Sequence, residues 1–170
     1  IRDGETAEIA VKAALTGHLV LSTLHANDAI GAVARLTNMG IEPYLIASSI
    51  LLVGAQRLPR KVCPACRKAA HPSKEVLQRL GVPSEGTYLK GAGCSLCRQT
   101  GLNGRVGLLE AISLTPELRR LVAEGCSAVR LREAARAAGF LSLRDYAVAK
   151  AVVGVMPLEE VARATVGYQE

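Results

Sequence analysis

Two pairs of cysteines of the form Cys-x-x-Cys constrain the middle of this 170-residue sequence more than any other feature. The pairs are Cys63/Cys66 and Cys94/Cys97, and 27 residues separate them. Two such pairs can bring four thiolates to one tetrahedral point, which suits Zn²⁺ because that ion has no ligand-field preference. All four ligands are thiols, so we expect a structural zinc site with no coordination position left open for catalysis.

Other interpretations of the cysteines are weaker. A thioredoxin-like redox motif lies at a strand–helix junction of a βαβ unit, and neither of these two Cys-x-x-Cys pairs is predicted at such a junction. Disulfides are typical of secreted proteins, and the first residues show no secretion signal. An iron–sulfur cluster is the nearest chemical alternative and stays open. The remaining Cys126 is interpreted as a small apolar residue at a helix start, and His71 as a loop histidine.

The net charge of +6 is concentrated around the cysteines. Residues 61–105 carry eight Lys or Arg and only two acidic residues, Glu75 and Glu85, whereas the flanking segments are neutral. Four thiolates and one Zn²⁺ would add about −2 and leave this segment near +4. Aromatic residues make up only 3% of the chain, which argues against base stacking on single-stranded nucleic acid. The alternative function is a zinc-dependent interaction module that docks on acidic protein or nucleic acid.

Composition and periodicity divide the chain into three segments: 1–60, 61–105 and 106–170. The first is predicted to be α/β, with helices over 5–16 and 28–39, a buried strand over 18–25, and a third helix from Tyr44 to Arg57. The second contains the cysteines and a short helix over 73–80. A strand is predicted over 105–112, and the rest of the third segment is helical, with starts at Thr115, Ser127, Ser142 and Pro157. The longest apolar stretch, residues 44–55, is too short to span a bilayer, which takes about 20 residues.

The predicted strand over 18–25 has a histidine at each end. Ligands bind beyond the carboxyl ends of parallel strands, and this rule favours His25 over His18. Thr23 lies two residues earlier on the same face of the strand. His25 and Thr23 are therefore candidates to sense a phosphate or a catalytic water. The alternative is a capping and packing cluster at a strand end.

The sequence resembles the secretion ATPases of the GspE/PulE and PilB/PilF type, which power type II secretion and type IV pilus assembly. The matching stretches, which extend over essentially the whole chain, are Ile1–Ala7, Ala13–Ala29, Arg35-Leu36, Met39–Glu42, Gln56–Leu58, the two Cys-x-x-Cys pairs, Gly104–Gly107, Leu143-Arg144 and Leu158–Val161.

The resemblance implies a hexameric, cytoplasmic enzyme that hydrolyses ATP with Mg²⁺ and acts through an inner-membrane platform protein. The chain is then expected to be the C-terminal flank of a RecA-like P-loop core, a small tetracysteine zinc-binding insertion and a mainly helical C-terminal subdomain. Under this resemblance we expect no nucleic-acid partner and no membrane-spanning segment.

The same resemblance assigns roles to individual residues. Arg2 and Asp3 match the trailing edge of the Walker B region, and His18 and His25 match the histidine box. The four paired cysteines match the family's zinc module. Arg35 and Arg57 are candidates for domain or subunit contacts.

Three departures limit the match. The sequence contains no G-x-x-x-x-G-K-[ST], so nothing in it cradles the β- and γ-phosphates, and we expect these 170 residues alone not to hydrolyse ATP. Ala26 stands where the family commonly has Thr. Met156 precedes Pro157 where a capping Thr is usual, which predicts a weaker start of the last helix. The sequence does not separate type II secretion from type IV pilus assembly.

Overall fold

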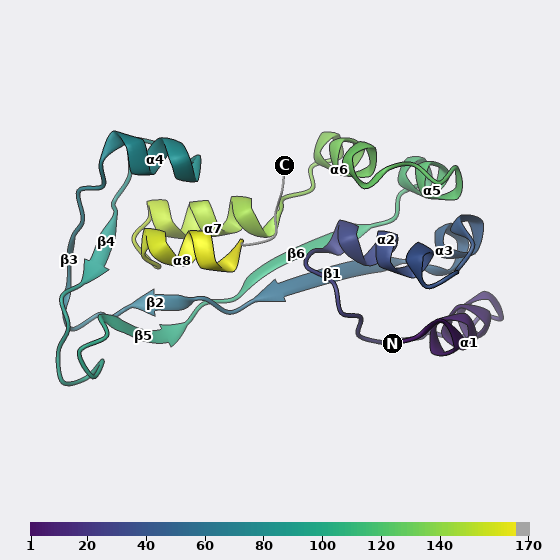
Figure 1. Cartoon of the computed structure of the whole chain (residues 1–170), viewed down its shortest axis with the longest axis horizontal. Helices are drawn as coiled ribbons and strands as arrows, with labels where there is room; N and C mark the ends of the chain where they lie inside the picture. The colour runs from purple at the N-terminus through teal and green to yellow at the C-terminus, as the bar shows by residue number, and fades with distance from the viewer. Residues whose placement is uncertain (166–170) are drawn as a thin grey trace. The chain divides into compact units, whose positions relative to one another are not determined.

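The computed structural model describes residues 1–165, and these fall into two compact units. The first comprises residues 1–55 and 110–140; the second comprises residues 56–109 and the described residues from Leu141 onward. Each unit is built from segments that are far apart in the sequence (Figure 1). Among the described residues, no helix is both long and apolar enough to cross a bilayer.

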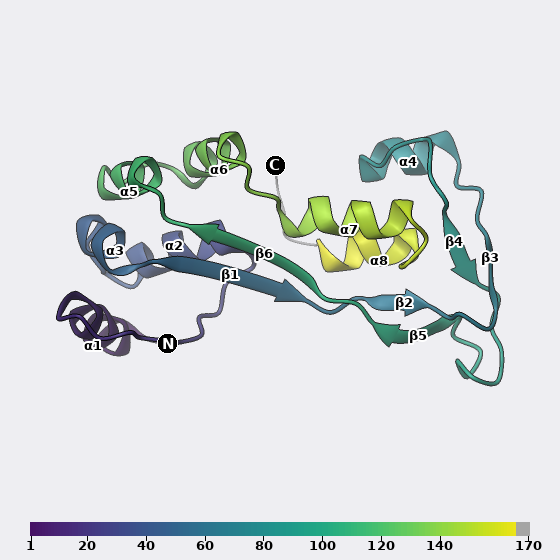
Figure 2. The ribbon, with the colours of Figure 1, turned by 180° about the vertical axis from the view of Figure 1, so that it is seen from behind.

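The first unit contains most of the helices and one pair of strands. Its elements are α1 (Gly4–Leu15), α2 (Ala29–Asn38), α3 (Pro43–Ser49), β1 (Leu52–Arg57, its last two residues in the second unit), β6 (Leu108–Ser113, its first two likewise), α5 (Pro116–Ala123) and α6 (Ala128–Ala137). The strands β1 and β6 pair with each other and run in opposite directions (Figure 2).

Local capping explains where α2, α5 and α6 begin. Asp28, Thr115 and Ser127 each accept a hydrogen bond from a backbone N–H in the first turn of the helix that follows. The apolar faces then pack together: α3 contacts α1 and α5, and α2 contacts α6. The resulting core is aliphatic and alanine-rich, as the scarcity of aromatic residues predicts.

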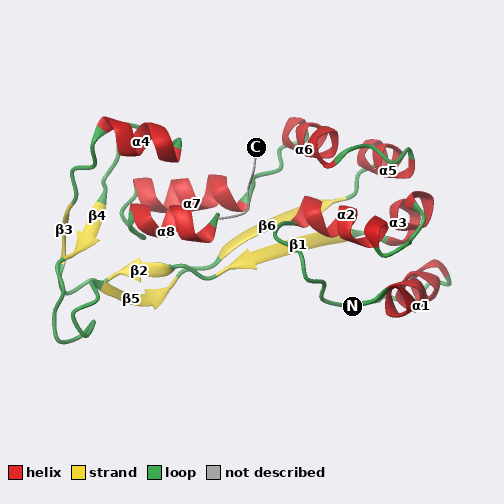
Figure 3. Cartoon of the chain, viewed as in Figure 1, coloured by secondary structure: helices red, strands yellow, loops and turns green. Residues whose placement is uncertain are grey.

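The second unit joins short strand pairs to three helices. Its elements are β2 (Arg60–Val62), β3 (Arg67–Ala69), α4 (Lys74–Leu80), β4 (Leu89–Gly91), β5 (Leu102–Arg105), α7 (Leu143–Val152) and α8 (Leu158–Ala164). The pairs β2–β5 and β3–β4 are antiparallel two-stranded ribbons joined by loops (Figure 3). The start of α8 at Pro157 lacks a side-chain cap, as predicted from Met156.

Helices α7 and α8 and the turn between them accept hydrogen bonds from β2 and from the residues that precede β4. The N–H of Val62 in β2 donates to the carbonyl of Val155, between α7 and α8, over 3.0 Å, and the N–H of Thr87 donates to Val152 over 2.7 Å. The N–H of Arg60 donates to the buried carboxylate of Glu160 over 2.7 Å. The segment boundaries at residues 60 and 105 remain a prediction. The hydrogen bonds described here connect α7 and the turn before α8 with residues 61–105, which we call the cysteine segment, and α8 with the adjacent Arg60.

Two predicted elements are wrong. The helix expected over Tyr44–Arg57 ends at Ser49, and the chain continues as β1. Residues 52–57 are apolar at several positions, and the pairing with β6, more than 50 residues away, decides their conformation.

The second wrong element is the buried strand over 18–25. No ladder pairs this stretch with another strand in the described part of the chain, and Leu19 and Leu21 are 76% and 87% exposed. A run of apolar residues becomes a buried strand only where neighbouring strands satisfy its backbone, so the sequence pattern alone was insufficient.

Candidate functional site

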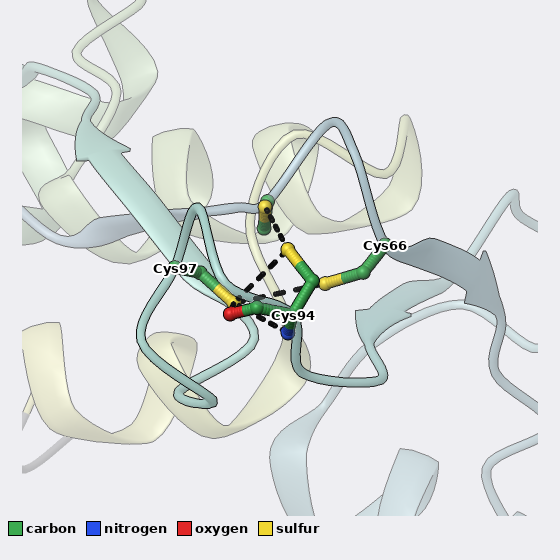
Figure 4. Close-up of side chains that lie close together, drawn as sticks. Cys66, Cys94 and Cys97 are labelled. Atoms are coloured by element: carbon green, nitrogen blue, oxygen red, sulfur yellow. Dashed lines mark hydrogen bonds between the residues drawn. The ribbon is translucent and has the colours of Figure 1, made fainter.

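The four paired cysteines meet at one point, as the spacing predicts. Their sulfur atoms all lie within 4.8 Å of one another, and Figure 4 shows Cys66, Cys94 and Cys97 pointing toward a common centre. The distance between sulfurs is 3.8 Å for Cys63 and Cys94, 3.8 Å for Cys66 and Cys97, and 3.6 Å for Cys94 and Cys97. These separations exclude disulfide bonds, whose S–S length is about 2.05 Å.

The sulfur separations fit a tetrahedral zinc ion. A Zn–S distance of about 2.3 Å places the corners of a regular tetrahedron about 3.8 Å apart. The three sulfur pairs given above match that edge length to within about 0.2 Å, and all four sulfurs lie within 4.8 Å of one another. The donor set is also the one that closed structural zinc sites use, so the residues present are suited to holding this metal.

Backbone donors and a close backbone contact shape the Cys94–Cys97 loop. The N–H groups of Cys94 and Gly101 each donate to the sulfur of Cys97 over 3.2 Å. Gly91 in β4 lies against Gly101, so close that a Cβ on Gly91 would come within 2.0 Å of the Gly101 carbonyl oxygen. The loop closes around the sulfurs because neither position carries a side chain.

Cys97 and Cys66 differ in pKa because their surroundings differ. Burial by itself raises the pKa of Cys97, but hydrogen bonds from the N–H groups of Cys94 and Gly101 and from neighbouring thiols outweigh it and lower this pKa to about 6. Burial raises the pKa of Cys66 to about 11. Because the thiolate is the form that binds a metal, these N–H donors favour the metal-binding form of Cys97.

The histidine segment, defined here as residues 18–27, lies in the first unit and belongs to no helix or strand. His18, Thr23 and His25 are all exposed, and the Nδ1 atom of His18 lies 3.1 Å from the hydroxyl of Thr16. His25 is followed closely by Asp28, which caps α2. Their roles as nucleotide sensors remain a prediction.

The start of the chain runs beside the histidine segment. The backbone nitrogen of Ile1 lies 2.6 Å from the carbonyl oxygen of Thr23, which brings the neighbouring Arg2 and Asp3 close to this segment. Asp3 also caps α1: its carboxylate accepts a 2.8 Å hydrogen bond from the N–H of Thr6, and this bond lowers the pKa of Asp3. The structure thus gives Asp3 a helix-capping role beside its predicted place near the Walker B region.

The two candidate contact arginines lie at element ends. Arg35 is in the last turn of α2, in the first unit, and Arg57 ends β1 at the start of the second. Both are exposed. Their role in domain or subunit contacts stays a prediction.

Sequence reasoning missed a buried carboxylate next to the histidine segment. Glu110 in β6 is fully buried, and its Oε1 atom accepts a 2.5 Å hydrogen bond from the N–H of Ala29, the first residue of α2. A signal was present: Glu110 shares the period-two face of its strand with the buried Leu108 and Ile112.

Comparisons with known proteins agree with the motifs. Residues 1–163 match the family of type II/IV secretion system proteins. The chain is 49% identical over 166 residues to the type IV pilus assembly ATPase PilB of Myxococcus xanthus, covering 95% of this chain and 29% of that protein. It is 48% identical over 165 residues to the type II secretion system protein HxcR of Pseudomonas aeruginosa, covering 97% of this chain and 32% of the relative.

Solved structures show the same fold with less sequence similarity. The pilus retraction motor PilT with bound ADP aligns with a TM-score of 0.65 at 21% identity, covering 96% of this chain and 37% of PilT. The ATPase DotB of Yersinia pseudotuberculosis aligns with a TM-score of 0.63 at 18% identity, covering 98% of this chain and 35% of DotB. The chain spans about a third of the length of the curated relatives it matches. By its matched residues and its identity to these relatives, the chain belongs to the type II/IV secretion system protein family.

Proposed function

We propose that this chain is the C-terminal part of a cytoplasmic ATPase that couples ATP hydrolysis to type IV pilus assembly or type II protein secretion. The observation that carries the proposal is near-half identity, over almost the entire chain, to relatives named for these two roles. The likeness to PilT and DotB supports the RecA-like core to which the first unit would belong.

The exposed histidine segment supports the same proposal. Large apolar side chains at Leu19 and Leu21 are open to solvent, and no strand pairs with this stretch in the described residues. Residues from the rest of the ATPase core would cover these apolar side chains. His25 would then face the nucleotide, which the rest of the protein binds with Mg²⁺.

The tetracysteine cluster would serve the enzyme structurally. Four thiolate ligands hold Zn²⁺ in a closed site, and the ion's contribution is to stabilise the fold around it. We further propose that the whole protein is a homohexamer associated with the inner membrane through a platform protein.

The test joins this chain to the remaining sequence of its M. xanthus relative. We expect the joined protein to hydrolyse ATP at a rate comparable to the unmodified relative, and the 170-residue chain alone to show no activity above background. A phosphate-release assay measures all three proteins, and size-exclusion chromatography with light scattering measures the hexamer. Hydrolysis by the isolated chain, or inactivity of the joined protein beside an active relative, contradicts the proposal.

A second candidate is an interaction module. Lys61, Arg67, Lys68 and Arg98 near the cysteines are exposed, so this basic surface is accessible to an acidic protein or nucleic acid. A zinc-loaded chain that binds duplex DNA with a steep salt dependence would favour the module. Absence of binding to DNA and to an acidic polypeptide would remove it.

A further inference from the structure

The start of α2 is held inside the protein by the side chain of its N-cap residue and by side chains from β6 and α6. Asp28, which precedes the helix, accepts a 2.5 Å hydrogen bond from the N–H of Gly31. Glu110 of β6 accepts one from the N–H of Ala29, also over 2.5 Å. Arg132 of α6 lies 3.3 Å from the second carboxylate oxygen of Asp28. We call this group, Asp28, Glu110 and Arg132, the α2 clamp.

The clamp uses backbone donors that a helix start would otherwise offer to a ligand. The first N–H groups of a helix have no partner within the helix and commonly bind phosphate. Here the N–H groups of Ala29 and Gly31 are taken by the protein's own carboxylates. A nucleotide phosphate near the histidine segment would therefore be met by the side chain of His25 and not by these two donors.

The contacts of the clamp are costly to break because its side chains are buried or mostly buried. Asp28 and Glu110 are 6% and 0% exposed, and the side chain of Arg132 is only 20% exposed. Removing one partner of a buried charge pair leaves the other unpaired in a medium that stabilises charge poorly. The start of α2 can thus shift relative to β6 and α6 only by breaking these contacts together.

We propose that Glu110 and Arg132 are positioning residues for the histidine segment: they fix where α2 begins and so where His25, three residues before Asp28, is placed. The proposal rests on the ATPase function proposed above. It also links α6 to the histidine segment, because any displacement of His25 on hydrolysis would reach α6 through the contact between Asp28 and Arg132.

The first test measures amide exchange in the 170-residue chain by NMR, which requires no ATPase activity. We expect Glu110→Ala to speed exchange of the Ala29 amide at least tenfold, and Glu110→Gln to keep it near the wild-type rate because its amide oxygen still accepts the bond. Arg132→Ala should speed exchange at Gly31. Arg136→Ala, an exposed arginine on the same helix, is the matched control and should change neither.

The second test measures steady-state ATP hydrolysis by the joined protein. Glu110→Ala and Arg132→Ala should lower kcat at least fivefold with KM for ATP within about twofold, and Glu110→Gln should restore kcat. A purely structural role would lower the folded fraction, measured by circular dichroism, and leave kcat per folded protein unchanged. That result overturns the proposal.

Further outcomes test the positioning role of Glu110 and Arg132. Unchanged amide exchange in Glu110→Ala and Arg132→Ala overturns the clamp, as does Glu110→Gln behaving like Glu110→Ala. If Glu110→Ala does not fold, Arg132→Ala carries both tests from a different element. An inactive wild-type joined protein refutes the proposed ATPase function, while the exchange rates still report on the clamp.

Discussion

His25 and His71 are both exposed histidines, but they lie in different units of the chain. Because the side chain of His25 is exposed, replacing it with alanine should remove little packing. We expect His25→Ala in the joined protein to lower kcat at least tenfold, about 1.4 kcal/mol in the activation free energy, while zinc content and hexamer formation stay unchanged. His71→Ala is the control and should match wild type. Equal turnover of the two variants would remove His25 from the mechanism.

At the residue scale, the sequence predicted the cysteine cluster correctly because the spacing of the ligands along the chain is enough to identify it. Two Cys-x-x-Cys pairs sufficed to predict the meeting of four sulfurs, because the loops that carry them are short. Glu110 was missed because its partner, the N–H of Ala29, is 81 residues away and no local pattern joins the two. An acidic residue on the apolar face of a strand was the available sign.

At the scale of secondary-structure elements, β4 packs closely against the residue that precedes β5, and both positions are glycines, Gly91 and Gly101. An added Cβ on Gly91 would lie 2.0 Å from the Gly101 carbonyl oxygen, so Gly91→Ala forces backbone atoms apart. We expect it to lower the free energy of unfolding by about 1–3 kcal/mol and to reduce bound zinc. Thermal unfolding and metal analysis measure both quantities.

The matched control is Gly107→Ala in the same unit, where an added Cβ meets nothing within 4 Å. It should keep wild-type stability and zinc content. A Gly91→Ala protein that matches this control would show that the backbone at Gly101 can move away from β4 at little cost.

Helices were predicted better than strands for a physical reason. The signals at Ser73, Thr115, Ser127 and Ser142 are local, and each of these residues caps the helix that follows it. Strands depend on partners far away in the sequence. The sequence pattern of residues 52–57 therefore predicted a helix, whereas the structure pairs them with β6 as a strand. The pattern of residues 18–25 predicted a strand, although no strand pairs with them in the described residues.

At the scale of the whole molecule, all four cysteine ligands lie in the second unit. So do the bonds that join the cysteine segment to α7 and α8, from Val62 to Val155 and from Thr87 to Val152. Because metal binding stabilises the fold around it, we expect removal of zinc by a chelator to loosen α7 and α8 together with residues 56–109. The first unit, which contributes no ligand, should keep its protection.

Hydrogen exchange measured by mass spectrometry separates these regions. Peptides from 56–109 and 141–165 should lose protection on chelation, and peptides from 1–55 and 110–140 should not. Cys97→Ser should reproduce the loss without chelator, whereas Cys126→Ser, in the first unit, should leave all peptides protected. Loss confined to 61–105 would instead favour the three-segment division of the sequence, in which zinc folds only a linker. The backbone bonds from β2 to the turn before α8 argue against that result, since β2 cannot unfold without breaking them.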